Sequence, residues 1–325
     1  MCRHSCVSGH HIVNHGRRVL AVMAVAGLFM TSCGTGIEVT EHVTDKDVRR
    51  VIGKTEKQES TVTLIPFKDP MSGWKTGKRF WVADDQVKQL LLYSGYDADT
   101  LHLSGHILCF DGWVSSDLYN AGSADVDIRF KDESTGQQLI YRYGKTVNDV
   151  HGEASLPMLI DMDKVEHVGR QVEGKDFFIR TPIWYDRSSG QMMAGNHFIK
   201  VHIDSVLPGN EVMPYRVLFT AADSHTRAMV WMSDPSSTML GRDFDALFSA
   251  SDPRLSYPEI SDENWAFITR GQVVEGMSKI ECQLSIGSAK QIREVPDQSG
   301  MREYWYYDGG SYLYFVDGLL RQYRR

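Results

Sequence analysis

Short runs of apolar and β-branched residues dominate the chain between about residues 61 and 232. Gly, Asp, Asn and Pro interrupt these runs, and several runs alternate between apolar and polar positions. In residues 126–130, for example, Val126, Ile128 and Phe130 fall on one face and the polar residues between them on the other. Such alternation is typical of half-buried antiparallel strands. The pattern predicts strands at Thr61–Ile65, Arg79–Val82, Leu101–Phe110, Val126–Phe130, Gln138–Tyr143, Asp176–Arg180, Asn196–Ile203, Tyr215–Thr220 and Ala228–Met232.

Three pairs of short motifs recur in the same order within this region. The pairs are Gly77-Lys78-Arg79-Phe80 with Gly174-Lys175-Asp176-Phe177, Gly105–Leu108 with Gly195–Ile199, and Ile128–Phe130 with Val217–Phe219. Their spacing nearly agrees, since Gly105 precedes Phe130 by 25 positions and Gly195 precedes Phe219 by 24. The agreement favours two tandem β modules, residues 61–145 and 158–233. Chance agreement between short strand motifs is the alternative.

A different pattern follows in residues 250–325, where two prolines mark a boundary because each disfavours helix in the residue before it. Ser261 is a predicted N-cap for a first helix, and Ser278-Lys279-Ile280-Glu281 is a Ser-x-x-Glu capping box that begins a second. Strands are predicted at Gln291–Val295, Arg302–Tyr307, Ser311–Phe315 and Leu319–Tyr323. The expected fold class is therefore α+β and mostly β, with one or two antiparallel β modules followed by a small domain of two helices and an antiparallel sheet.

Alternation in the last strands separates two sets of aromatic residues. The set predicted to face the core is Trp305, Tyr307, Leu313 and Phe315. The set on the other face is Tyr304, Tyr306, Tyr312 and Tyr314. Tyrosine combines apolar area with a polar hydroxyl and is enriched at protein interfaces, so the second set are candidate partner-binding residues. Packing of these rings against the β-rich region is the alternative.

This C-terminal region, residues 250–325, resembles the SmpA/OmlA (BamE-like) domain family. The resemblance rests on Gly276–Glu281, Leu284–Gly287, Trp305–Tyr307 and Tyr312–Leu319, although Ala289 stands where the family usually has proline. It implies a small α+β module of two helices on an antiparallel sheet, commonly lipid-anchored and engaged in protein–protein contacts. It implies no catalysis.

The N-terminus carries a second signal. Val19–Met30 is an apolar run of a dozen residues, preceded by three arginines and no acidic residue. It is shorter than the about 20 residues that cross a bilayer, and it predicts a signal peptide over residues 1–32. The ending Met30-Thr31-Ser32-Cys33 resembles the lipobox of bacterial lipoproteins, which implies lipidation of Cys33. An ordinary secretory signal is the alternative. Because Gly34 rather than Asp follows, the outer membrane is favoured, on either face.

Composition narrows the function further. The polar composition of residues 33–60 predicts a tether between Cys33 and the β-rich region 61–249. The net charge is −7 and becomes −10 without residues 1–32, which carry three arginines, so a general nucleic-acid surface is disfavoured. Of five cysteines, Cys109 and Cys282 remain after the signal and the lipid site, and free thiols are favoured over a bridge between them.

Candidate chemistry is sparse. The most ligand-like cluster is His102, His106, Cys109 and Asp111, but alternation along a strand separates Cys109 from the histidines, so no metal site is expected. Asp161 and Asp163 fall on one face if their segment is a strand, where a solvated edge is favoured over a carboxylate pair. The sequence contains no nucleophile elbow, zinc-protease motif or phosphate loop. We expect no enzyme and no cofactor.

Two functions remain open at this stage. The first is a lipid-anchored, non-catalytic scaffold that binds an envelope protein and serves outer-membrane assembly or maintenance. The second is capture of a glycan or peptide ligand by the β modules, with tryptophans near predicted loops as the candidate contacts. These tryptophans are Trp74, Trp81, Trp113 and Trp184.

Overall fold

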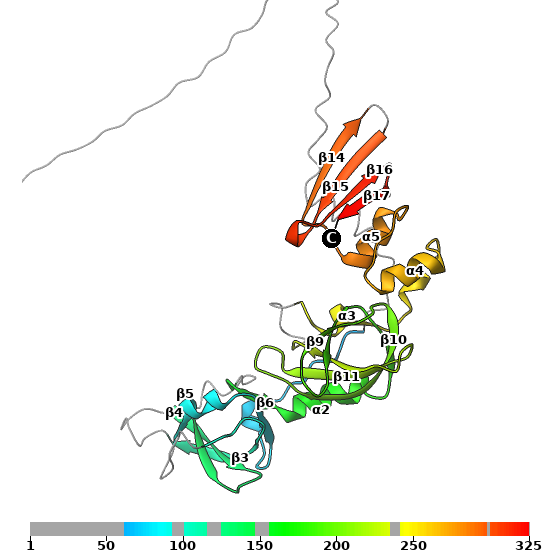
Figure 1. Cartoon of the computed structure of the whole chain (residues 1–325). Helices are drawn as coiled ribbons and strands as arrows, with labels where there is room; N and C mark the ends of the chain where they lie inside the picture. Colours follow the sequence, from blue (N-terminus) through cyan, green and yellow to red (C-terminus); the bar gives the residue numbers. More distant parts are fainter. Residues whose placement is uncertain are drawn as a thin grey trace, which may run out of the picture. The chain divides into compact units, whose positions relative to one another are not determined.

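Strands form three antiparallel sheets in the computed structural model of the chain (Figure 1). The structure describes residues 62–92, 101–115, 125–146, 156–234, 241–297 and 300–324. The expected mostly β fold with antiparallel sheets is confirmed. The segments predicted as signal peptide and tether, residues 1–32 and 33–60, lie outside the described residues. No described helix is both long enough and apolar enough to cross a membrane.

The first sheet has six strands in the order β2-β5-β4-β3-β1-β6. Their bounds are β1 Arg79–Val82, β2 Leu91–Leu92, β3 Ile107–Ser115, β4 Asp125–Asp132, β5 Gln138–Thr146 and β6 Leu159–Asp161, with 3₁₀ turns at Met71–Gly73 and Asp85–Leu90. Val126, Ile128 and Phe130 are buried, which confirms the predicted core face of β4. Asp127 is also buried, because a register shift interrupts the pairing there, and its Oδ1 accepts a hydrogen bond from the Tyr143 amide.

The second sheet has seven strands in the order β13-β7-β10-β11-β12-β8-β9. Their bounds are β7 Asp176–Ile179, β8 Ile183–Asp186, β9 Met192–Ala194, β10 Ile199–Pro208, β11 Tyr215–Ala221, β12 Arg227–Met232 and β13 Phe248–Ser249, with α3 at Phe244–Leu247 and a 3₁₀ turn at Pro253–Ser256. Val201, Val217 and Phe219 are fully buried in its core. The strand predicted at Thr61–Ile65 is wrong, since residues 62–65 have no regular structure.

Helix α2, Met162–Val172, replaces the strand face considered for Asp161 and Asp163. Asp161 is the N-cap, and its side chain accepts a hydrogen bond from the Asp163 amide. Val165, Val168 and Val172 are buried against the second sheet, where α2 packs on β10 (Figure 1). Three valines favour strand by propensity, but their spacing of three and four residues places them on one helix face. Packing of that face decides the local structure.

A buried lysine joins the first sheet to α2. Lys78 is 8 % exposed and lies directly before β1. Its ammonium is 2.8 Å from Asp161, 2.6 Å from Asp163 and 2.9 Å from Asp69. Burial lowers the pKa of Lys78, but the hydrogen bonds to Asp161 and Asp163 outweigh it and hold the pKa above its usual value. The ammonium is therefore charged and fully surrounded by acceptors.

The recurring motifs fall on corresponding strands of the two sheets. The first pair precedes and begins β1 and β7, the second leads into β3 and β10, and the third lies in β4 and β11. Both sheets contain the neighbouring order β1-β3-β4-β5 or β7-β10-β11-β12. The residues in the paired motifs differ in environment, because Lys78 is buried while Lys175 is exposed. Whether the modules arose by duplication stays a prediction.

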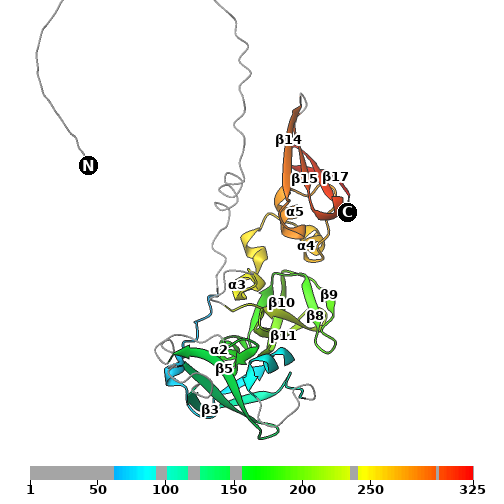
Figure 2. The ribbon, with the colours of Figure 1, turned by 90° about the vertical axis from the view of Figure 1, so that its left-hand side faces the viewer.

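The C-terminal residues form α4 (Asp262–Thr269), α5 (Lys279–Ile286) and a third sheet in the order β14-β15-β16-β17. The strands are β14 Gln291–Asp297, β15 Gly300–Tyr306, β16 Tyr312–Val316 and β17 Leu319–Arg324. The Ser261 N-cap and the Ser278–Glu281 capping box are confirmed. Figure 2 shows both helices at one end of the four strands. Trp305, Leu313 and Phe315 are buried against them, and Tyr307 is partly buried.

Two residues before β10 connect the second sheet to this C-terminal core. Phe198 packs among the residues around Trp265, and His197 is 3 % exposed. The His197 amide donates to the Thr269 carbonyl at 2.9 Å, and Nε2 lies 3.0 Å from the Leu284 carbonyl. Its Nδ1 is buried with no hydrogen-bond partner among the described residues. Burial lowers the pKa of His197, although the Leu284 carbonyl opposes the shift, so the neutral ring is favoured.

Replacing Lys78 by methionine should destabilise the fold strongly. The methionine would leave Asp161 partly buried without its cation, and loss of one partner of a buried ion pair costs about 3–5 kcal/mol. The matched control is Lys175→Met at the corresponding motif position, where the exposed ammonium donates to the Gln171 carbonyl. Its expected cost is within about 0.5 kcal/mol. Urea unfolding measures both, and equal midpoints for the two variants would contradict the assigned role of Lys78.

Stability should fall as the pH drops below about 6.5, the usual pKa of histidine. Because the folded pKa of His197 is lower, the unfolded chain binds the proton first, so this contribution is complete above pH 6.5 and is lost below it. The slope is at most about 1.4 kcal/mol per pH unit. His197→Gln should remove this part of the slope in urea titrations. The control is His225→Asn at an exposed position with φ of 53°, which asparagine tolerates.

Candidate interaction surface

Alternation along β15 and β16 creates a tyrosine face on the C-terminal sheet. In β15, Tyr304 and Tyr306 flank the buried Trp305, and in β16 Tyr312 and Tyr314 flank the buried Leu313. The period of two places each set on its own face. A turn at Asp308–Gly310 joins the strands, with Gly309 and Gly310 at φ of 71° and 81° that glycine adopts without strain. The predicted separation of core and surface aromatics is therefore observed.

Strand register brings the four tyrosines together. Tyr304 pairs with Tyr314 and Tyr306 with Tyr312, so the rings occupy two adjacent rows. The ring centroids of Tyr304 and Tyr314 are 4.7 Å apart, and those of Tyr304 and Tyr306 are 6.5 Å apart and stacked. Tyr306 is 37 % exposed and the other three are partly buried. Three rings are therefore in contact through Tyr304, Tyr312 lies opposite Tyr306 in the register, and we call the surface of these four residues the tyrosine face.

Arginines extend the tyrosine face, and the sequence analysis missed them. Arg293 in β14 pairs with Tyr304, Arg324 in β17 pairs with Tyr312, and Arg302 precedes Tyr304 by two positions. The sequence could have predicted Arg302, because the Arg-x-Tyr-x-Tyr spacing of β15 places all three residues on one face. The set of polar and basic residues sharing the face with the tyrosines is Gln291, Arg293, Arg302, Gln322 and Arg324.

Two glutamates of these strands lie on the opposite face. Glu294 and Glu303 pair across β14 and β15. Glu303 is 5 % exposed, forms an ion pair with Lys279 of α5, and accepts a hydrogen bond from Trp305 Nε1 at 3.3 Å. Lys279 thus offsets the repulsion of two carboxylates placed opposite each other.

The four candidate tryptophans do not form one site. Trp74 and Trp113 stack with centroids 6.0 Å apart and an interplanar angle of 17°, beside the buried rings of Phe80 and Phe110. Trp81 packs partly buried against the core of the second sheet.

Trp184 belongs to the core of the second sheet and is 3 % exposed. Its Nε1 donates to the Thr181 carbonyl. Gly195 lies so close to Trp184 that an added Cβ would stand 2.0 Å from the indole. Trp184 is therefore a core residue, and the pair Trp74 and Trp113 is the arrangement left for ligand contact.

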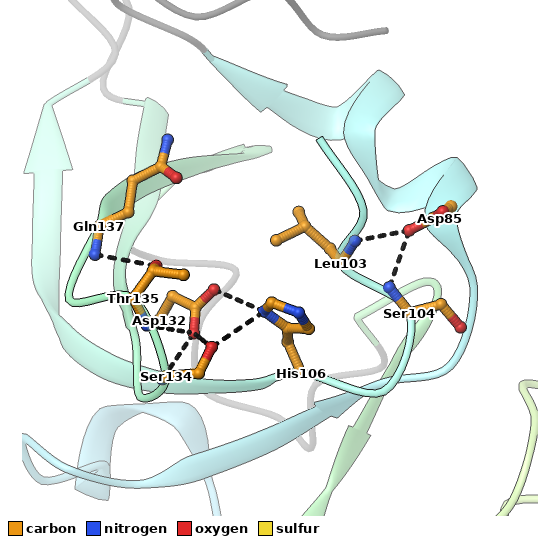
Figure 3. A network of polar contacts seen from close by, with 8 residues as sticks. All are labelled: Asp85, Leu103, Ser104, His106, Asp132, Ser134, Thr135 and Gln137. Carbon is orange, nitrogen blue, oxygen red and sulfur yellow. Dashed lines mark hydrogen bonds and ion pairs between the residues drawn. The ribbon is translucent and has the colours of Figure 1, made fainter. Parts of the chain in front are cut away.

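The four residues of the ligand-like cluster have separate partners. His102 contacts Asp85, Asp111 contacts Arg129, and the thiol of Cys109 has a pKa raised by burial and by Glu133. His106 Nδ1 lies 2.7 Å from Asp132 (Figure 3). Among the described residues, no group of three or more His, Cys, Asp or Glu side chains is arranged to hold a metal ion.

Asp132 organises a turn rather than a reaction centre. Its Oδ1 accepts hydrogen bonds from the Ser134 amide at 2.8 Å and the Ser134 hydroxyl at 2.7 Å (Figure 3). Burial raises the pKa of Asp132, but the bonds from His106 and Ser134 outweigh it and lower the pKa. A hydrolytic triad needs its serine and its carboxylate on different ring nitrogens, whereas Ser134 and Asp132 both contact Nδ1 of His106. The network closes the β4–β5 hairpin.

The Asp85 carboxylate forms the second half of Figure 3 and ties the segment before β3 to the 3₁₀ turn. Its Oδ1 accepts from the amides of Leu103 and Ser104 at 2.6 Å and 2.7 Å. Burial alone would raise the pKa of Asp85, but the hydrogen bonds from Ser104, His102 and Leu103 outweigh burial and lower the pKa to about 2. This carboxylate is fully engaged in holding the loop.

Comparisons of the chain with models of protein families, with curated proteins and with solved protein structures found no match. The geometry of the tyrosine face therefore carries the functional conclusion. That face offers apolar ring area, hydroxyl groups and guanidinium groups, which are the groups that protein–protein interfaces use.

Proposed function

We propose that the chain is a lipid-anchored protein of the cell envelope that acts as a non-catalytic scaffold for another protein. The observation that carries the proposal is the tyrosine face, four tyrosines in adjacent register positions on one face of the C-terminal sheet, with Tyr304 in ring contact with Tyr306 and Tyr314. Tyrosine and arginine together are enriched in the residues that dominate protein interfaces. A rigid, hydrogen-bonded sheet presents them without a large loss of conformational entropy on binding.

The anchor rests on the N-terminal sequence. The apolar run Val19–Met30, the arginines before it and the lipobox-like ending at Cys33 support lipidation of Cys33, with the folded part following a tether. Gly34 after the cysteine supports the outer membrane as the location. A single lipid chain would bind a membrane weakly, so stable anchoring requires the multiple acyl chains that bacterial lipoproteins carry.

The order of elements in the C-terminal module also supports the proposal. Two capped helices precede a four-stranded antiparallel sheet, which is the arrangement implied by the resemblance to SmpA/OmlA (BamE-like) domains. Lipid anchoring and protein contacts are common in that family. A role in outer-membrane assembly or maintenance follows for this chain as part of the same proposal.

Affinity purification from detergent-solubilised envelopes tests the scaffold. The double variant Tyr304→Thr/Tyr306→Thr removes two rings and keeps residues that favour strands. We expect recovery of the co-purifying envelope protein, measured by quantitative mass spectrometry, to fall at least tenfold, since truncating one aromatic hot-spot residue of an interface costs about 2 kcal/mol or more.

Tyr323→Thr is the matched control, because Tyr323 is 43 % exposed and pairs with Leu313 of the opposite face. It should keep the partner, and both variants should unfold at similar temperatures. Unchanged recovery of the partner by Tyr304→Thr/Tyr306→Thr would contradict the proposed scaffold function.

In the same experiment, Cys33→Ser should lose palmitate labelling and leave the membrane fraction. Retention of Cys33→Ser in the membrane fraction would contradict anchoring through a lipid on Cys33.

Capture of a glycan or peptide by the β modules is the second candidate. The observation that favours it is the stacked pair Trp74 and Trp113, both of which remain partly exposed. Quenching of intrinsic fluorescence by soluble peptidoglycan fragments, lost in Trp113→Leu, is the expected result of such a site. Unchanged fluorescence across a panel of envelope glycans and short peptides would remove this candidate.

A further inference from the structure

The arginines of the tyrosine face lie at its two opposite edges. Across the sheet, one row reads Arg293, Tyr304, Tyr314, Gln322 and the next reads Gln291, Tyr306, Tyr312, Arg324. Arg293 belongs to the edge strand β14 and Arg324 to the edge strand β17, and both are exposed. The tyrosine rings therefore lie between two diagonally placed guanidinium groups.

This local charge is opposite to that of the whole chain. The chain carries a formal net charge of −7, yet arginines occupy three register positions of the tyrosine face, and the acidic residue at such a position is Asp297, opposite Gly300 at the far end of β14. The two glutamates of the strands, Glu294 and Glu303, lie on the other side of the sheet. An acidic partner is repelled by most of the molecule and attracted here, which favours one orientation of approach.

The chemistry of the two residue types agrees on the partner. A guanidinium group binds a carboxylate through two parallel hydrogen bonds, and tyrosine rings pack against apolar side chains while their hydroxyls bond to polar groups. We propose that the tyrosine face binds an acidic segment of a partner protein, with Arg293 and Arg324 pairing with two of its carboxylates. This inference rests on the proposed function, because it assigns the partner chemistry of the same surface.

Sheet geometry sets the spacing of those carboxylates. Arg293 and Arg324 are three strand spacings apart and two positions apart along the strands. With about 4.8 Å between strands and about 3.4 Å per residue, their backbone separation is about 16 Å. An extended chain covers that distance in about five residues. The matching segment is extended and acidic at positions about five residues apart, with apolar or aromatic residues between them.

Fluorescence anisotropy with the full chain in detergent tests the inference. The probe is a short fluorescein-labelled peptide with Glu at two positions five residues apart and Leu and Thr between them, and its twin carries Lys at those positions. We expect binding of the Glu peptide, weakened by added salt, and no measurable binding of the Lys peptide. Arg293→Glu/Arg324→Glu should weaken binding at least tenfold. The control Arg227→Glu, at an exposed position of β12, should leave it unchanged.

Other outcomes overturn the inference. Equal binding of both peptides, or an unchanged affinity in the double reversal, contradicts carboxylate recognition. Heparin or an oligothymidylate that displaces the Glu peptide at equal charge concentration would make the face a general polyanion site. In envelope purifications, one outcome is that the partner is lost with Tyr304→Thr/Tyr306→Thr but kept with Arg293→Glu/Arg324→Glu. That result would support the scaffold proposal and contradict only the proposal that the partner segment is acidic. A partner kept by both variants removes the two proposals together.

Discussion

The ion cluster around Lys78 is the constraint on which the first two sheets depend. One ammonium, almost excluded from water, holds carboxylates from the segment before β1, from the end of β6 and from the first turn of α2. A charge at that depth is tolerated only when its partners are in place. Because α2 packs on the second sheet, this electrostatic requirement joins the two sheets, in addition to the apolar contacts that Trp81 of β1 and Ile160 of β6 make with the core of the second sheet.

Strands with clear alternation and punctuated ends could be predicted from sequence, as β1, β4 and β11 show. Both helix caps of the C-terminal module could be predicted from the sequence, because capping is local chemistry between residues three positions apart. Helix α2 was not, since three valines suggest strand until a neighbouring sheet buries their common face. The short strands β2, β6 and β13 have no pattern of their own and form only as edges added to existing sheets.

The tyrosine half of the interaction surface followed from a period of two, but its basic half did not. Arg293 and Arg324 join the face through register across four strands, which no local spacing specifies. Likewise the histidines near β3 looked like a cluster along the chain, whereas the hairpin turn supplies the actual partner of His106. Trp184 looked like a loop residue and is a core ring, because Gly195 permits close approach of the backbone.

The strand order also bears on how the chain reaches its native state. Many pairings join strands that are consecutive in sequence, which limits the entropy lost on closing the loops between them. Strand β6 is an exception, because it returns to β1 across the whole first module and leads directly into α2. A nascent chain that ends before residue 159 has β1 and Lys78 but neither β6 nor the carboxylates of Asp161 and Asp163. The first sheet is therefore complete only after the chain has been made as far as residue 161, where the second module has already begun.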